Sequence, residues 1–346
     1  MVFATGPIPI QALGRPGNAY KSPSVVALGG GHGLSASLSA LRRLTTDLTA
    51  VVTVADDGGS SGRLRDSFDV LPPGDLRMAL AALCDDNDWG RTWRDVMQHR
   101  FDSTQNPDEP LNGHAVGNLL IMALWELLDD PVAGLRWAGA LLGARGQVLP
   151  MSTVPLSIHG EALSSLEGSD ELVRRRIDGQ ATLAKSSQGG LLTKVWLEPA
   201  DAPACPEALE AIELADWIVL GPGSWYTSVL PHLLLPEMRS ALERTTARKV
   251  LAMNLNTNTA ETVGLDAAAH LDVLLNYAPG LRFDAIIADG QKIRNPERFE
   301  LAAKKLGARV FFSRVGVTDG RAVHDPLRLA AAYHEVFTAI GSPGSM

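Results

Sequence analysis

Short apolar runs alternate with longer segments of helical spacing along most of the chain. Residues 24–28 are apolar, rich in β-branched side chains and followed by glycines, which is typical of a buried parallel strand. Residues 34–44 carry leucines spaced for one face of a helix. A second apolar run at residues 49–54 follows, so residues 24–54 are predicted to form a βαβ unit of ordinary length.

The same alternation continues to the C-terminus. Residues 154–163 and 181–197 alternate polar and apolar positions, which predicts a small inserted antiparallel and helical excursion. The repeated strand–helix order predicts an α/β fold: a Rossmann-like, doubly wound, mostly parallel sheet with helices on both faces. Further strands are predicted at 217–220, 249–254, 283–288 and 309–312, and further helices at 75–83, 90–100, 115–128, 206–214, 265–277 and 326–340.

Composition adds a domain prediction. The chain has 346 residues, of which 45% are hydrophobic and 20% charged, an ordinary globular balance. Residues 1–20 contain three prolines and no apolar core of signal-peptide length, and are predicted to be a flexible tail. Because no linker or internal repeat follows, residues 21–342 are predicted to be a single domain.

Charge and cysteine usage narrow the partners. The net charge is −8, from 31 basic and 39 acidic residues, without a basic run, so no nucleic-acid partner is expected. No apolar run reaches the ~18–20 residues that span a bilayer, so no membrane insertion is expected. The two cysteines, Cys84 and Cys205, lack zinc spacing and are expected to be reduced thiols, one or both of them buried. Together with the missing export signal, this predicts a cytoplasmic protein.

A glycine loop, GGGHG at residues 29–33, separates the first strand from the first helix. Glycines there let main-chain N–H groups at a helix N-terminus approach a phosphate. The dinucleotide pattern G-x-G-x-x-G is broken at Leu34, which argues against an NAD-dependent oxidoreductase. His32 is open to two interpretations, a structural histidine or a donor to phosphate. Ligand contacts are predicted for Gly30, Gly31, His32 and Gly33.

The second strand ends in a block dense in Asp, Gly, Ser and Arg at residues 55–65. Asp56 follows Gly33 by 23 residues, close to the offset of about 20 at which a carboxylate meets ribose hydroxyls. Asp57 is a candidate for a cation or a sugar hydroxyl, and Arg63 offers a planar fork for phosphate. Ligand contacts are predicted for Asp56, Asp57, Ser60, Ser61 and Arg63.

Three further segments are expected at the same edge of the sheet. Residues 72–77 open a helix, where Asp75 is either its N-cap or a ligand contact and Arg77 points toward phosphate. Asn118 lies on a predicted helix, and a ligand or a structural hydrogen bond satisfies its amide. A second glycine loop follows the strand at 217–220, and Trp225 or Tyr226 is expected to stack on a ring. Its predicted contacts are Gly221, Gly223, Ser224, Tyr226, Thr227 and Asn254.

These motifs resemble the YvcK/CofD-like family, and most closely its YvcK branch, the gluconeogenesis factors. The matching segments cover nearly the whole chain, and the block at residues 55–65 is the most specific. The resemblance implies binding of a UDP-sugar and a role in cell shape and wall synthesis on gluconeogenic carbon sources. A homodimer and a regulatory protein partner in wall metabolism are compatible with it. The resemblance rests on residues 29–33, 55–65, 73–77, 113–119, 221–228 and 261–262.

The sister branch implies an alternative. It is similar to 2-phospho-L-lactate transferase, for which Asp56 and Asp57 would hold Mg²⁺ and a nucleotide diphosphate would serve as donor. The binding role needs no cofactor and no catalytic residue, and no nucleophile–base pair stands out in the motifs. The chain departs from the family at His32, where a threonine is usual, and at Val323, where a ligand-contacting arginine is usual.

Overall fold

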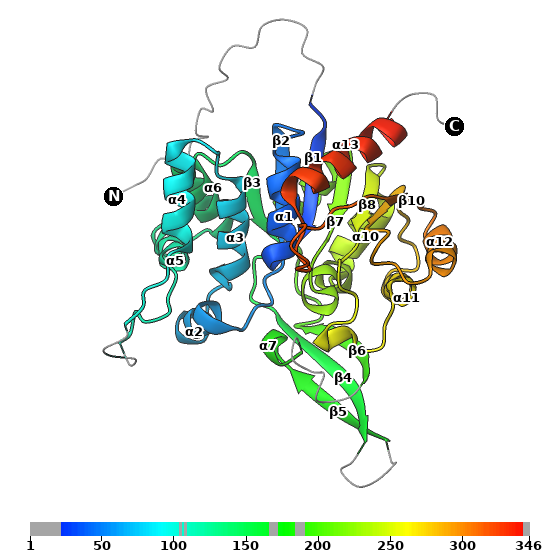
Figure 1. Cartoon of the computed structure of the whole chain (residues 1–346). Coiled ribbons are helices and arrows are strands. Elements are labelled where there is room, and N and C mark those ends of the chain that lie inside the picture. The colour runs from blue at the N-terminus through cyan, green and yellow to red at the C-terminus, as the bar shows by residue number, and fades with distance from the viewer. Residues whose placement is uncertain (1–21, 104–105, 107–108, 166–171, 184–190, 342–346) are drawn as a thin grey trace, which may run out of the picture.

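The computed structural model describes residues 22–103, 106, 109–165, 172–183 and 191–341; the predicted tail at residues 1–20 lies outside them. A parallel sheet of seven strands forms the centre of the described part, in the order β10-β9-β8-β7-β1-β2-β3 (Figure 1). The predicted α/β class is therefore confirmed. The strands are β1 (Ser24–Gly29), β2 (Asp47–Val52), β3 (Gln147–Pro150), β7 (Trp217–Leu220), β8 (Arg248–Ala252), β9 (Ala285–Ala288) and β10 (Arg309–Phe312).

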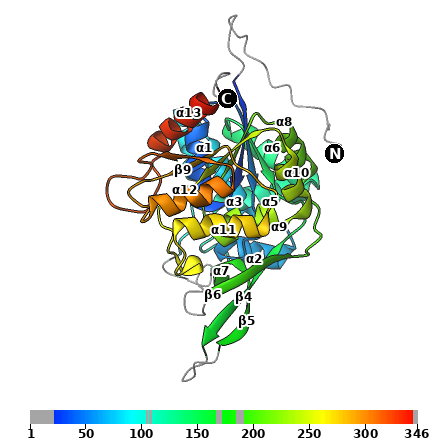
Figure 2. The same cartoon turned by 90° about the vertical axis from the view of Figure 1, so that its right-hand side faces the viewer.

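Helices cover both faces of this sheet. Figure 2 shows α1 and α13 on one side, and α8 and α10 on the other. The central strands are consequently buried on both faces: Val25, Ala27 and Leu28 of β1 are each at most 1% exposed. This explains why the sequence gives them as continuous apolar runs rather than as alternating ones. The helices that flank the sheet include α1 (Gly31–Leu41), α3 (Pro73–Leu83), α8 (Pro206–Leu214), α10 (Pro236–Arg244), α12 (Pro296–Lys305) and α13 (Pro326–Gly341).

The strand order reverses beside β1. The chain moves from β1 to β2 and β3 on one side, and β7, β8, β9 and β10 extend the sheet on the other. In such sheets the crevice for a ligand lies at the carboxyl ends of the strands where the order reverses. The two glycine loops leave the carboxyl ends of β1 and β7, which pair with each other, so both loops lie at this point.

A three-stranded antiparallel sheet projects below the main sheet, in the order β5-β4-β6 (Figures 1 and 2). The predicted excursion is confirmed, although residues 184–190 of it lie outside the described part. The middle strand of this sheet corresponds to the alternating segment predicted at residues 154–163. The sequence does not predict the edge strand at residues 172–178, because three consecutive arginines interrupt the alternation there. The strands are β4 (Ser157–Ser165), β5 (Leu172–Asp178) and β6 (Leu191–Glu198).

Several elements differ from the sequence prediction. Most of the block dense in Asp, Gly, Ser and Arg at residues 55–65, for which no helix is predicted, lies in helix α2 (Gly59–Phe68). Helix α1 begins at Gly31, three residues before the first leucine of its apolar face. Helix α6 (Pro131–Leu142) was not predicted. The remaining helices are α4 (Asp88–Gln98), α5 (Val116–Leu128), α7 (Gln180–Leu183), α9 (Pro231–Leu234) and α11 (Ala267–Tyr277).

Both cysteines are buried free thiols, as expected. No helix in the described part of the chain is long and apolar enough to cross a membrane.

Candidate functional site

The two glycine loops touch each other at the carboxyl edge. A side-chain Cβ at Gly33 would overlap the carbonyl oxygen of Pro222 and lie 2.6 Å from Cα of Gly223, so glycine alone fits there. The amide of Asn254 holds the second loop, since its Oδ1 accepts from the Gly223 N–H at 2.9 Å and its Nδ2 donates to the Gly223 carbonyl. The predicted convergence of the first and second glycine loops is therefore present, and Asn254 supports it.

A cavity of about 440 Å³ opens between these loops. His32 is exposed at its rim. His324, on the opposite wall, is partly buried, and the loss of solvent around its ring lowers its pKa to about 4; Nε2 of the neutral ring donates to the Met253 carbonyl at 3.2 Å. Val323, which stands where the family usually has a ligand-contacting arginine, also lines the cavity. The nearby Arg321 does not take over that role, because it forms an ion pair with Asp319. The lining residues include His32, Gly33, Pro222, Gly223, Ser224, Asn254, Asn256, Thr259, Glu261, Val323 and His324.

Glu261 occupies the N-terminus of the helical turn that follows the second glycine loop, residues Trp225–Val229. Its carboxylate accepts from the Trp225 N–H at 2.7 Å and from the Ser224 hydroxyl at 2.8 Å. Burial raises the pKa of Glu261, and these hydrogen bonds oppose that rise. The carboxylate of Glu261 thus serves as the anion that accepts from the N-terminus of this turn, a position for which the sequence also allows a phosphate or a sugar of the ligand.

The aromatic residues of this turn point into the core. Trp225 is fully buried, with its ring edge-on to His270 at 5.0 Å between centroids. Tyr226 and Thr227 are 4% and 1% exposed, and burial raises the pKa of Tyr226. Neither ring belongs to the cavity lining, so the expected stacking of Trp225 or Tyr226 on a ligand ring does not fit the structure. Packing against the sheet takes precedence over exposure for such large apolar surfaces.

Asp75 lies against the first glycine loop, and Asp56 lies against the first turn of α3. A Cβ at Gly30 would lie 2.5 Å from Oδ2 of Asp75, and a Cβ at Gly74 would lie 3.1 Å from Oδ2 of Asp56. Burial, reinforced by the nearby Asp56, raises the pKa of Asp75 to about 7, although the Gly31 N–H donates to it. Burial also raises the pKa of Asp56.

Asp75 is not the N-cap of its helix. Helix α3 begins at Pro73 after an N-cap at Pro72 that makes no side-chain hydrogen bond, and Asp75 lies in the first turn. Its carboxylate bonds Gly31 instead, because the two helix N-termini meet here. Asp57 turns away: it accepts from the Ala181 N–H at 2.8 Å. Asp56 therefore has two carboxylate neighbours: the charge of Asp57 helps to raise the pKa of Asp56, and Asp75, which the sequence does not pair with it, lies near it as well.

A buried chain of polar side chains continues from this pair. Arg77 donates through Nε to Asn118 Oδ1 at 2.9 Å, and Asn118 donates through Nδ2 to the Ser60 hydroxyl at 3.0 Å. The Ser60 hydroxyl also bonds Nδ1 of His114 at 3.1 Å. Burial lowers the pKa of His114. All four side chains are at most 7% exposed, which indicates that the Ser60–His114 contact positions Asn118 and Arg77.

Arg77 is the member of this chain with unused hydrogen-bonding capacity. Its guanidinium is 3% exposed and its Nη1 has no partner. Burial and the nearby Arg100 lower its pKa to about 10, while Asp75 and Asp56 act against that shift. A buried donor without a partner is rare and carries a free-energy penalty. An anionic ligand that accepted a hydrogen bond from Nη1 would remove this penalty.

The remaining predicted residues lie around this cluster. Ser61 is 3% exposed, and its hydroxyl bonds Asp56. Arg63 donates to the Asn112 carbonyl at 2.8 Å from the exposed side of α2. Sequence reasoning did not select Glu261, His114 or His324 as site residues. Glu261 and His114 lie inside family motifs, and this is the only feature of the sequence that points to them. Spacing along the chain does not show which polar residues become buried next to one another.

The acidic residues of the site decide whether a metal ion would bind with help from the ligand. Within the described ranges, no group of three or more His, Cys, Asp or Glu side chains is arranged to hold a metal ion. Mg²⁺ is commonly held by one or two carboxylates together with substrate phosphates and water. Asp56 and Asp75 supply two neighbouring carboxylates, as many as such a site takes from the protein.

The switch-point crevice, the touching glycine loops and the buried carboxylates define an α/β protein of the CofD class. The chain belongs to this family: the sequence model described as 2-phospho-L-lactate transferase CofD matches residues 25–310. Among relatives, it is 49% identical over 313 residues to a Mycobacterium leprae protein provisionally named a gluconeogenesis factor, covering 90% of this chain and 85% of that one. It is 36% identical over 274 residues to the gluconeogenesis factor of Bacillus subtilis, covering 79% and 80%.

The fold is also similar to a solved structure. A crystal structure of a UPF0052-family protein from Bacillus halodurans superposes with a TM-score of 0.77 at 34% sequence identity, covering 91% of this chain and 99% of that one. The similarity to relatives named gluconeogenesis factors supports the YvcK branch of the resemblance drawn from the sequence.

Proposed function

We propose that this protein binds a nucleotide sugar of the UDP-N-acetylglucosamine type and acts as a regulator, needed for cell shape and wall synthesis during gluconeogenic growth. The relatives' name, gluconeogenesis factor, supports the setting. The regulatory part rests on the family resemblance. The ligand class is argued below from the carboxyl edge of the sheet.

The single observation that carries the ligand class is the unpartnered donor of Arg77. The charges of Asp75 and Asp56 act on this buried guanidinium, and Asp75 contacts the first glycine loop. A phosphate oxygen accepts a hydrogen bond from such a donor. The planar guanidinium group is also suited to donating two parallel hydrogen bonds to a phosphate. The diphosphate is therefore assigned to the region between Gly31 and Arg77, and the rest of the ligand to the cavity of about 440 Å³ lined by His32 and Asn256.

Ligand-dependent stability tests this function. The protein is titrated with UDP-N-acetylglucosamine, GDP and NAD, with and without Mg²⁺, while its unfolding is followed. A ligand at 100 times its dissociation constant should add about 2.7 kcal/mol to the free energy of unfolding. Stabilisation by the UDP-sugar, without conversion of it, supports the proposal. Absence of stabilisation by any UDP-sugar would contradict it.

Two variants sharpen that test. Asp56→Ala and Arg77→Met remove a carboxylate and the unpartnered guanidinium, and both should abolish the ligand-induced stabilisation. The exposed Arg175, on β5, gives a matched control as Arg175→Met, which should bind as the wild type does. If Arg77→Met retained wild-type affinity in a variant shown to be folded, the diphosphate assignment would be wrong.

A second function is favoured by the pairing of Asp56 with Asp75. These carboxylates can hold the Mg²⁺ of a nucleotide diphosphate donor, and Arg77 can neutralise a transferring phosphoryl group, as in a 2-phospho-L-lactate transferase. Under this alternative, GDP with Mg²⁺ stabilises the protein more than the UDP-sugar does. Product formation from a guanylylated lactate and a deazaflavin acceptor would then be measurable.

A further inference from the structure

A second cavity lies at the amino edge of the main sheet, opposite the candidate site. Its volume of about 370 Å³ is within the ~300–1,000 Å³ that small-molecule sites occupy. Residues that lead into three neighbouring strands line it: Ser22 precedes β1, Thr45 and Thr46 precede β2, and Arg145 precedes β3. Because these strands are parallel, their amino ends share one edge of the sheet, and the glycine loops leave the other edge. The cavity is therefore separate from the candidate site.

Arginines dominate the charged lining of this cavity. Arg42 and Arg43 follow α1, and Arg145 reaches the same cavity from the segment before β3. Asp85 and Asp86 line it as well, so three positive and two negative side chains give the lining a net charge of +1, whereas the whole chain carries −8. We call these five residues the arginine pocket. A concave concentration of positive charge attracts anions.

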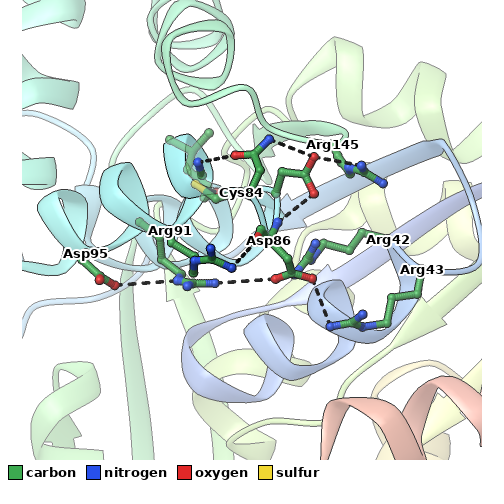
Figure 3. Close-up of polar contacts among 12 residues, drawn as sticks. Arg42, Arg43, Cys84, Asp86, Arg91, Asp95 and Arg145 are labelled. Carbon is green, nitrogen blue, oxygen red and sulfur yellow. Dashed lines mark hydrogen bonds and ion pairs between the residues drawn. The ribbon is translucent and has the colours of Figure 1, made fainter.

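One aspartate is shared by several arginines in the arginine pocket (Figure 3). The carboxylate of Asp86 accepts from Arg42 at 2.7 Å and from Arg43 at 3.2 Å, and Arg94 lies 3.9 Å away. The hydrogen bond from Arg42 holds the pKa of Asp86 below its usual range, and the charges of Arg43 and Arg94 act in the same direction. Within the described part of the chain, neither Arg42 nor Arg43 forms an ion pair with another carboxylate. Positive charge therefore remains after the pairing.

Arg42 also has a hydrogen-bond donor that the described residues leave unsatisfied. Its side chain is only 6% exposed, and its Nε has no partner among them. The guanidinium does not cap the end of α1, because main-chain N–H groups already serve the last carbonyls: Leu38 accepts from the Arg42 N–H, and Leu41 accepts from the Leu44 N–H. A buried donor without a partner carries a free-energy penalty. A tetrahedral oxyanion would bring acceptors that the single shared carboxylate lacks.

We infer that the arginine pocket binds a small phosphorylated molecule, whose phosphate accepts hydrogen bonds from Arg42, Arg43 and Arg145. Arginine suits this role because its planar guanidinium can donate two parallel hydrogen bonds to phosphate oxygens. The volume of the cavity leaves room for the rest of the molecule beside the phosphate. This site shares no residue with the candidate site, so the inference does not depend on the proposed function.

Calorimetric titration of the full chain with inorganic pyrophosphate tests the site. Pyrophosphate also suits the candidate site, so variants must separate the two. Arg43→Gln combined with Arg145→Gln should weaken binding at the arginine pocket about tenfold or more, because charge-assisted hydrogen bonds are lost. Arg77→Met should leave this binding intact. The matched control is Arg298→Gln, at an arginine of α12 that is 56% exposed and likewise paired with an aspartate, and it should bind as the wild type does.

Asp86→Asn gives a prediction of the opposite sign. Asp86 competes with the anion for the arginines, so removing its charge should tighten pyrophosphate binding about threefold or more. A purely structural role for Asp86 gives no reason for tighter binding. Circular dichroism confirms that each variant is folded. If the double variant does not fold, Arg43→Gln alone takes its place, since this side chain is 40% exposed, and it should also weaken binding.

Four results would overturn the inference. The first is a wild type that does not bind pyrophosphate, and the second is unchanged binding in the folded arginine variant. The third is loss of all binding in Arg77→Met, which would assign the pyrophosphate to the candidate site alone. The fourth is equal weakening by Arg298→Gln, which would indicate a general effect of charge. The nucleotide-sugar titrations are separate, so the proposed function can stand or fall independently of this result.

Discussion

Asp75 has the most consequential ionisation among the residues of the site. In the folded chain its pKa is about 7, against an ordinary value of 3.8, because the carboxylate is buried and lies near Asp56. Between pH 4 and pH 7 the unfolded chain releases this proton while the folded chain keeps it. The contribution of Asp75 to folding stability is therefore fully present below pH 4 and is lost as the pH rises through 7.

Asp75→Asn should remove this pH dependence. The amide oxygen still accepts from the Gly31 N–H, but no charge develops in the buried site. Relative to the wild type, the variant should be more stable by about 2–4 kcal/mol at pH 8 and nearly unchanged at pH 4. Urea unfolding across this range measures the difference. Asp66→Asn, at an exposed position of α2, is the control and should show no such trend; a flat difference for Asp75→Asn would refute the argument.

Glu261 shows a second residue-scale effect, the capping of a helical turn by a distant carboxylate. Both carboxylate oxygens of Glu261 accept hydrogen bonds, one from the Trp225 N–H and one from the Ser224 hydroxyl. Glu261→Gln replaces one of these oxygens with an NH₂ group, which cannot accept. One buried donor loses its acceptor, which should cost about 2 kcal/mol of unfolding free energy. Denaturant unfolding gives the value. Glu300→Gln, exposed on α12, should change stability by less than about 0.5 kcal/mol.

At the scale of elements, the loops after β1 and β7 form one unit. They come from strands that are about 190 residues apart in the chain but pair directly in the sheet. The sequence predicts each loop from its glycines and each strand from its apolar run. It does not show that α2 begins inside the glycine-serine block, since Gly and Ser are weak helix formers and only packing against the sheet overrides that preference.

Gly33→Ala tests the contact between the two loops. The added methyl group overlaps the Pro222 carbonyl, so the loops must separate. We expect a loss of about 1–3 kcal/mol in stability and at least a tenfold loss in affinity for the nucleotide sugar. The control is Gly290→Ala, where an added Cβ would meet nothing closer than 3.6 Å. Calorimetric titration and thermal unfolding measure both effects, and wild-type affinity in Gly33→Ala would show that the loops do not form a common site.

At the scale of the whole molecule, one continuous sheet ties the two halves of the chain together. Helix α13, at the C-terminal end, packs on α1 near the start, and the hydroxyl of Tyr333 meets that of Ser37 at 2.7 Å in the core. Ser37 also donates to the Gly221 carbonyl at 2.9 Å. The first helix, the second glycine loop and the last helix are thus linked by one buried network.

This architecture predicts one cooperative unfolding transition. Far-ultraviolet circular dichroism, which follows secondary structure, and near-ultraviolet circular dichroism, which follows core packing, should give the same denaturant midpoint. A saturating ligand should move both midpoints together. Two separate transitions, of which the ligand shifts only one, would show that residues 21–342 are not the single domain predicted from the sequence.

The sequence alone determined the α/β class, the central strands and the two glycine loops, because burial on both faces leaves continuous apolar runs and tight turns require glycine. Only the tertiary structure decided that Asp75 joins Asp56 and Asp57, that Glu261 caps the turn after the second loop, and that Tyr226 points inward. Those outcomes depend on which helix ends meet across the sheet, and spacing along a chain carries no information about contacts between segments so far apart.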